Sequence, residues 1–212
     1  MPLQNRVTPT SEIVADPARG MFMGNRGILH DAHGQLGAAR WRHRSWICCQ
    51  LSFKNRRRML MAPRRYTELF FLDEATALAA GHRPCFECRR EAFREFQAAW
   101  RRVFRTTDCS AAAMDRVLHR ARVEPRTRRQ IRLEAPLDDL PDGVFVLLDQ
   151  APSTPLLVLG DRLLPWRASG YASAHPRPPA IGCRVLTPAP TVAVIRAGYV
   201  PSLHPAAGRA ID

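Results

Sequence analysis

The chain has 212 residues, of which 46% are hydrophobic, and it carries a formal net charge of +13 with an isoelectric point near 10.9. This length suffices for one large domain or two small ones around a hydrophobic core, and the surplus of basic residues favours polyanionic partners. No apolar run follows Met1, and no stretch reaches the roughly 18 apolar residues of a membrane helix, so we expect neither a signal peptide nor a membrane span.

The sequence begins without a regular pattern and continues into short strands. Residues 1–20 mix Pro, Thr, Asp and Gly without a period, which predicts a loose N-terminal arm. Residues 26–30 are predicted to form a strand that ends in a hairpin turn over residues 31–34. Two further apolar segments, 45–53 and 58–61, flank a basic tetrad at 54–57 that we place on a hairpin tip.

The charge between Asp31 and Glu68 is one-sided, because this interval contains no acidic residue. Trp41, Trp46 and Tyr66 are interleaved with the basic residues. Arginines can bind phosphates and aromatic rings can stack on bases, so the segment predicts contact with nucleic acid, with DNA as the expected partner. The alternative is a solvated basic face with the tryptophans in the core. The predicted nucleic-acid contacts are Arg40, Arg42, Arg44, Lys54, Arg56, Arg57, Arg58, Arg64 and Arg65.

A short helix over residues 74–80 precedes a pair of cysteines. Asp73 is a suitable N-cap, and Gly81 can adopt the left-handed conformation that ends a helix. Cys85 and Cys88, three residues apart, are predicted to lie on the first turn of the next helix and to point the same way. The helix N-terminus favours thiolates, so the pair suits half of a zinc site.

Two longer helices are predicted next. The helix over about 86–105 carries an apolar stripe that we assign to the core. Ser110 is a plausible N-cap for a third helix over 110–123, and Pro125 would stop it. The members of the stripe are Phe93, Phe96, Trp100 and Phe104.

The character of the chain changes after a Pro- and Asp-rich stretch at 135–142, which reads as a linker. Pro and Gly punctuate the short strands that follow, which predicts a small antiparallel sheet or barrel. Residues 201–212 are predicted to be a frayed tail. The predicted strands are 143–149, 156–159, 162–166, 183–186 and 192–196.

Residues 71–88 carry a resemblance to a known family. They read Phe-Leu-Asp-Glu-Ala-Thr-Ala-Leu-Ala-Ala-Gly-His-Arg-Pro-Cys-Phe-Glu-Cys. A short helix, a Gly-aromatic-Arg-Pro turn and a Cys-x-x-Cys in this order resemble the second half of the zinc-binding N-terminal domain of Ada-type DNA repair proteins. The resemblance covers roughly residues 45–93. It implies a treble-clef-type module that holds one zinc with four cysteines, binds DNA, and uses one cysteine to accept a methyl group from a methylated phosphate.

The remaining zinc ligands would have to come from elsewhere in the chain. The resemblance places one of Cys48 and Cys49 at the position of the family's first cysteine, whereas its second falls near Ser52 or Phe53, which supply no thiolate. Adjacent residues of a strand point to opposite sides, so Cys48 and Cys49 are not expected to bind the same ion. Water or a histidine can complete the site, or the cysteines are metal-free and buried as small apolar residues. The candidate histidines are His82, His43, His30, His33 and His119.

The six cysteines are unevenly spaced, which argues against a disulfide framework and favours a cytoplasmic protein with reduced thiols. Nucleotide-binding and hydrolase motifs are absent from the sequence. By residue type alone the chain also offers candidate general bases, but each is better explained as a cap, a helix-start charge or an ion-pair partner. These acids are Glu68, Asp73, Glu74, Glu87 and Glu91.

The predicted fold class is α+β. An Ada-like zinc and helical domain with β-hairpins is expected over 21–134, and a small C-terminal β unit over 135–200. The predicted function is that of a zinc-containing, arginine-rich DNA-binding protein linked to DNA repair or regulation. One alternative is a self-methylating phosphotriester repair protein with Cys48 or Cys49 as acceptor. Another is a metal-free structural or protein-interaction module.

Overall fold

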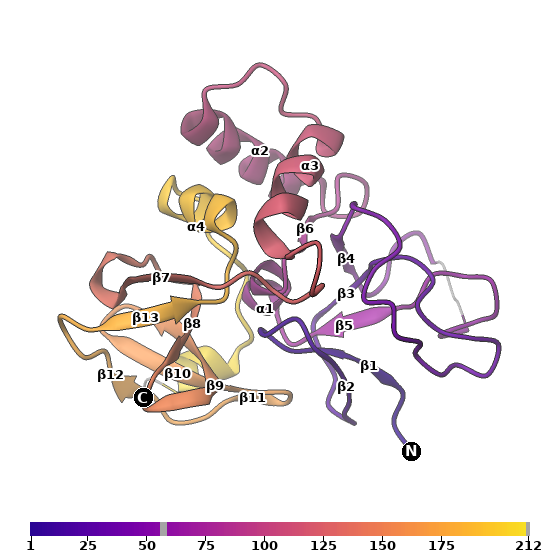
Figure 1. The fold of residues 1–212 in the computed structure, drawn as a ribbon, viewed down its shortest axis with the longest axis horizontal. Coiled ribbons are helices and arrows are strands. Elements are labelled where there is room, and N and C mark those ends of the chain that lie inside the picture. The colour runs from indigo at the N-terminus through magenta and orange to yellow at the C-terminus, as the bar shows by residue number, and fades with distance from the viewer. Residues whose placement is uncertain (56–58, 211–212) are drawn as a thin grey trace.

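The computed structural model describes residues 1–55 and 59–210, and the fold is α+β. Figure 1 shows two sheets side by side, one from the N-terminal half of the chain and one from the C-terminal half, with the two longest helices gathered at one end. Among the described residues, no helix has the length and apolar character needed to cross a membrane.

The first sheet has six strands in the order β2-β1-β5-β3-β4-β6, and it is mixed because β1 runs parallel to β5 and β4 parallel to β6. The predicted loose arm over 1–20 is wrong. Two of its segments pair as antiparallel strands, and Val7 and Ile13 are buried in the core beneath them. The strands are β1 Gln4–Val7, β2 Ile13–Ala15, β3 Phe22–Asn25, β4 Ile47–Gln50, β5 Leu69–Phe71 and β6 Arg83–Pro84.

The strands expected over 26–62 are only partly present. The turn at 31–34 is confirmed, because the Asp31 amide donates to the Gln35 carbonyl, but it is closed by a single bridge between His30 and Leu36 rather than by strands. The segment 45–53 contributes only β4. Residues 59–61 form a turn instead of a strand, and residues 56–58 lie outside the described part of the chain.

The helices largely follow their local signals. Asp73 caps α1 by accepting from the Thr76 amide at 2.9 Å, and Ser110 caps α3 by accepting from the Ala113 amide at 3.2 Å. Phe96 and Trp100 of the predicted stripe are buried. The helices of the first two thirds of the chain are α1 Glu74–Ala79, α2 Arg90–Phe104 and α3 Ala111–Arg122.

The second sheet is antiparallel and open, so the sheet is confirmed and the barrel is not. Its order is β11-β10-β9-β8-β13-β7, and β12 pairs with β10. The predicted linker at 135–142 is wrong at its start, since Ala135 and Pro136 pair with β13 as an edge strand and a 3-10 turn, Leu137–Asp139, follows. The strands are β7 Leu133–Pro136, β8 Phe145–Leu148, β9 Ala151–Leu159, β10 Arg162–Arg167, β11 Gly170–Tyr171, β12 His175–Pro176 and β13 Gly182–Val185.

Two further predictions in the C-terminal part are wrong. The segment 192–196 belongs to a helix, α4 Ala189–Arg196, which packs against α2 and α3 and buries Val194. A short run of β-branched residues fits a buried helix as well as a strand, and packing decides between them. The predicted frayed tail contains α5 Ala206–Arg209, and the His204 amide before it donates to the Asp73 carboxylate.

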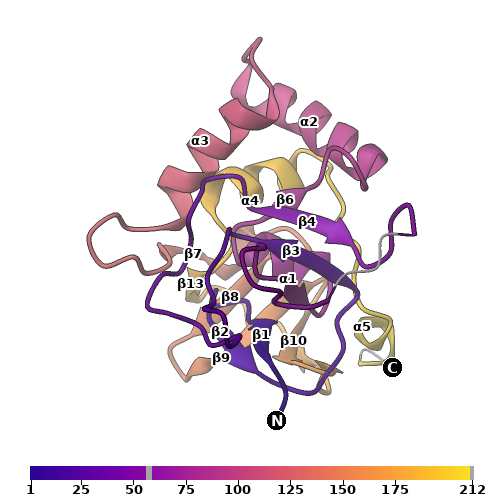
Figure 2. The same cartoon turned by 90° about the vertical axis from the view of Figure 1, so that its right-hand side faces the viewer.

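The largest core joins parts of the chain on both sides of the expected boundary at 134/135. Phe96, Trp100 and Leu118 from α2 and α3 pack in one cluster with Val146 and Val158 of the second sheet. Figure 2 shows the same arrangement from the side, with α2 and α3 above α4 and the strands below. The division into two domains stays a prediction, but the helical pair shares its core with the C-terminal sheet.

Candidate functional site: three cysteines beside a cavity

Strand β4 separates the two adjacent cysteines. Cys48 pairs with Gly24 and Cys49 with Met23 on the neighbouring β3, and successive side chains of a strand point to opposite faces. Cys48 is fully buried in the core with Leu69. Cys49 therefore emerges on the other face, as the alternation predicted.

Cys85 and Cys88 are brought to this face by β6. The Cys85 amide donates to the Cys48 carbonyl at 2.9 Å, so β6 lies directly beside β4. The expectation that both cysteines lie on the first turn of the long helix is wrong. They lie in a separate turn, in which the Arg89 amide donates to the Cys85 carbonyl, and α2 begins only at Arg90.

The sulfurs of Cys49, Cys85 and Cys88 lie within 4.8 Å of one another, and all three cysteines are free. Sulfurs bound to one tetrahedral ion at about 2.3 Å are about 4 Å apart, so the three fit a single metal ion. Two segments more than thirty residues apart in sequence thus form one thiol cluster. Of the two candidate upstream ligands, Cys49 belongs to it and Cys48 does not.

Hydrogen bonds within the cluster favour one thiolate. The thiols of Cys49 and then Cys88 lower the pKa of Cys85, because their hydrogen bonds stabilise its charged form. The same bonds raise the pKa of Cys49, which acts as a donor. Negative charge therefore gathers on a sulfur to which a cation can bind.

None of the candidate histidines joins the cysteine cluster within the described residues. His82 is fully buried on the core side: its Nε2 accepts from Arg26 Nε at 3.0 Å and its Nδ1 donates to the Ile47 carbonyl at 3.1 Å. Burial, and then the Arg26 charge, lower the pKa of its imidazole. Within residues 1–55 and 59–210, the only cluster of side chains that could hold a metal ion consists of the three cysteines. The candidate histidines that lie outside this cluster are His30, His33, His43, His82 and His119.

The cysteines open onto a cavity of about 650 Å³ on the exposed face of the first sheet. Met23 and Phe70 form part of its lining, and Glu68 contributes a carboxylate. Since the described residues supply three ligands, the fourth position is open to solvent or to a molecule in this cavity. Three protein ligands and one open position are typical of catalytic rather than structural zinc.

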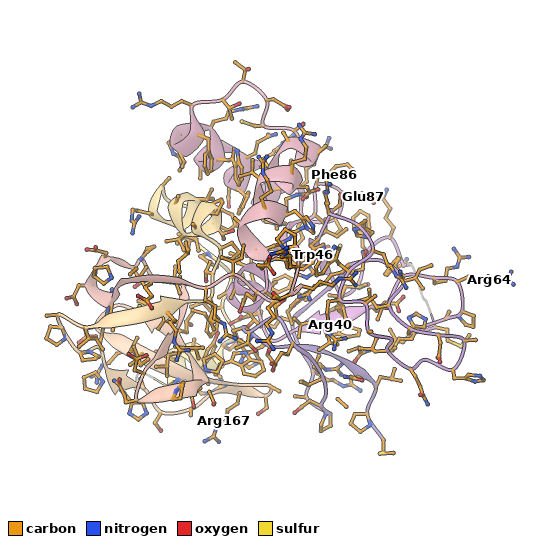
Figure 3. The ribbon with its side chains drawn as sticks, viewed as in Figure 1. Arg40, Trp46, Arg64, Phe86, Glu87 and Arg167 are labelled. Carbon is orange, nitrogen blue, oxygen red and sulfur yellow. The ribbon has the colours of Figure 1, made fainter. Side chains whose placement is uncertain are left out.

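The predicted nucleic-acid contacts are exposed wherever they are described, and Figure 3 shows Arg64 projecting from the edge of the molecule. Trp46 is a correction: it is buried between the guanidinium groups of Arg26 and Arg122, at 4.1 and 4.0 Å, and cannot stack on a base. Arg56, Arg57 and Arg58 lie outside the described residues. The exposed basic residues are Arg40, Arg42, Arg44, Lys54, Arg64 and Arg65.

Sequence reasoning missed a buried ionic network behind the cysteines. Arg89 forms two hydrogen bonds with the Glu74 carboxylate, at 2.6 and 2.9 Å, and approaches the Cys48 sulfur at 3.5 Å. Burial alone would lower the pKa of Arg89, but the hydrogen bonds and the charge of Glu74 outweigh burial and raise the pKa overall. Because Arg89 directly follows Cys88, the pair fastens the cysteine turn to α1. No specific signal in the sequence pointed to this ion pair, because a glutamate such as Glu74 at the start of a helix is already explained by its interaction with the helix N-terminus.

No family model matches the chain, and neither curated proteins nor solved structures show significant similarity to it. The resemblance to Ada-type zinc domains, the cytoplasmic location and the link to DNA repair therefore stay predictions.

Proposed function

We propose that this protein binds one zinc ion through Cys49, Cys85 and Cys88, with the fourth position directed to the cavity. The observation that carries the proposal is the approach of three free sulfurs from two distant segments to within 4.8 Å. Thiolates select soft or borderline ions, and a tetrahedral sulfur-rich set suits zinc. Bound zinc supplies Lewis acidity, and it orients a fourth ligand.

The metal content of the purified protein tests this proposal. We expect one zinc per chain by elemental mass spectrometry after expression with zinc and gel filtration. Because the ligands must be thiolates, metal affinity is expected to fall as the pH is lowered. A folded protein that retains less than about a tenth of an equivalent would contradict the proposal.

A second role in binding DNA is favoured by the exposed basic residues between 40 and 65. Six of the nine predicted contacts are described, and all six are exposed. Arg64 and Arg65 lie on one loop. Lys54 lies near the cysteine cavity, because its neighbour Phe53 lines that cavity. The Ada resemblance adds support for DNA and for a role in repair or regulation.

Binding to DNA is expected to depend steeply on salt. If four to six phosphates are neutralised, the logarithm of the binding constant should fall against log salt with a slope of about −4 to −5. Replacing Arg64 and Arg65 by Ser should reduce the slope by about 1 to 2. The matched control replaces Arg94 and Arg101, which are exposed on α2, and should leave the slope unchanged. Fluorescence anisotropy with a short DNA duplex measures the salt slope of each variant. An equal reduction of the slope in the two double variants would contradict the proposed surface.

The burial of Cys48 leaves the self-methylating alternative with one candidate acceptor. Cys48 is inaccessible to a methylated phosphate, and burial is the main cause that raises the pKa of its thiol. Because a methyl acceptor must be an accessible thiolate, Cys48 is unsuited to this role. Cys49 reaches the cavity and remains the candidate acceptor of this alternative. The fourth cysteine that the Ada-type domains use has no counterpart in the described cluster.

A further inference from the structure

The cavity floor is one row of side chains across three neighbouring strands. Phe70 of β5 pairs with Met23 of β3, and Met23 pairs with Cys49 of β4. Paired residues of adjacent strands share a face, so the three side chains stand side by side. Neighbouring strands are about 4.8 Å apart, which places Phe70 about 10 Å from Cys49. The thiol cluster thus occupies one end of an apolar floor.

Glu68 supplies a buried carboxylate toward the other end. It precedes Phe70 by two residues, so the strand period places both on the cavity face. Glu68 is only 2% exposed, and its Oε2 accepts from the Met61 amide at 2.8 Å. In the described part of the chain, neither an ammonium nor a guanidinium group pairs with it. Since the described residues pair this buried carboxylate with an amide and not with a cation, a ligand that brings a cation is favoured here.

Arg6 contributes a guanidinium group to the cavity lining beyond Phe70, and this group also donates to the Ala18 carbonyl and to the Asn5 side chain. It is the registered partner of Phe70 on β1, and its guanidinium carbon lies 4.9 Å from the centroid of that ring. Arg19 lines the same part of the cavity. The order across the sheet is therefore a guanidinium, an aromatic ring with a carboxylate beside it, an apolar residue and the thiol cluster.

From these receptors, we propose that the cavity binds a small aminothiol peptide, with its thiolate on the open metal position, its ammonium on Glu68 and a carboxylate at Arg6. The proposal rests on the proposed function, because the sulfur needs the metal. On binding, the thiol releases its proton to solvent and binds as a thiolate. The ligand must reach from the thiol cluster past Phe70, about 10 Å away, to the Arg6 guanidinium, whose carbon lies 4.9 Å from that ring. Free cysteine is too short for this distance, whereas a peptide of two or three residues with its side chains covers it. A cavity of about 650 Å³ is within the range of small-molecule sites.

Titration calorimetry of the zinc-loaded protein with glutathione tests the ligand class. Glutathione carries all three groups, and we expect saturable binding with one equivalent per chain. S-methylglutathione lacks the thiol, N-acetylglutathione lacks the ammonium, and cysteine lacks the length. Each of these compounds should bind at least about tenfold more weakly than glutathione, because each lacks at least one of the charge-assisted contacts to the metal, Glu68 or Arg6. In cobalt-loaded protein, glutathione should change the visible spectrum, and S-methylglutathione should not.

A Glu68→Gln variant tests the receptor in the protein. Glutamine retains an acceptor for the Met61 amide but removes the charge, so glutathione affinity should fall about tenfold or more while zinc content is unchanged. The matched control is Glu95→Gln, which removes the charge of an exposed acid of α2 outside the cavity. It should bind glutathione like the wild type.

The outcomes separate this inference from the metal proposal. A folded protein without zinc contradicts the proposed function. Zinc that stays bound while glutathione and cysteine bind equally, or while Glu68→Gln has no effect, overturns the aminothiol site. Removal of zinc by glutathione, seen as zinc in the small-molecule fraction on gel filtration, overturns it as well.

Discussion

Replacing Cys49 by Ser is expected to abolish stoichiometric zinc binding, whereas replacing its neighbour Cys48 by Ser is expected to preserve it. Cys49 shares a site with Cys85 and Cys88, and Cys48 lies in the core on the opposite face of β4. Loss of one of three protein ligands leaves two, too few for a stable tetrahedral site. The adjacent cysteine is a matched control, because the two residues have the same type and the same strand.

The Cys49→Ser variant is also expected to be less stable to thermal unfolding than the Cys48→Ser variant. Structural zinc contributes about 10–16 kcal/mol in small zinc peptides, so a metal-linked part of this larger fold should be lost in Cys49→Ser and on treatment of the wild type with a chelator. Cys48→Ser should cost about 1–3 kcal/mol from burying a hydroxyl, with zinc retained. Elemental analysis and thermal unfolding measure both. Equal zinc content in the two variants would show that the cluster does not bind the ion.

Replacing Glu74 by Gln is expected to lower the free energy of unfolding by about 3–5 kcal/mol, because it leaves Arg89 buried without its countercharge. The side chains of Arg89 and Glu74 are 8% and 2% exposed. The Glu74 carboxylate also accepts from the Tyr199 hydroxyl at 2.5 Å and from the Ser202 amide at 3.0 Å. One side chain therefore joins α1, the cysteine turn and the C-terminal segment.

Urea denaturation measures the effect. The control Glu95→Gln changes an exposed acid of α2 and should alter stability by less than about 0.5 kcal/mol. Tyr199→Phe removes one hydroxyl from the network and should cost about 1–1.5 kcal/mol. If Glu74→Gln costs no more than Glu95→Gln, the ion pair does not contribute to stability as its burial predicts. Zinc affinity should fall with Glu74→Gln, because Arg89 positions the turn that carries Cys88.

The proposed zinc site and the proposed DNA-binding surface consist of different residues. The proposed DNA binding rests on exposed residues such as Arg64 and Arg65, and the proposed metal binding rests on Cys49 and its two partners. The two proposals can therefore be tested separately. A variant that loses zinc and still binds DNA with the same salt slope would assign the cavity a role of its own.

Local signals in the sequence determined much of the site. The caps at Asp73 and Ser110 were predictable because each depends on a side chain and an amide three residues away. The shared direction of Cys85 and Cys88 was also local, although a turn rather than the helix produces it. The alternation of strand side chains predicted that Cys48 and Cys49 would point apart, but not which of them would meet the pair.

Tertiary structure decided the remainder, because pairing between distant segments carries no local signature. It turned the expected loose arm into strands β1 and β2, and it turned the apolar run at 192–196 into part of α4 through packing against α2 and α3. It selected Cys49 by placing β6 beside β4. It also brought Glu68 to the same cavity as the cysteines, since three strands from separate parts of the chain form one face.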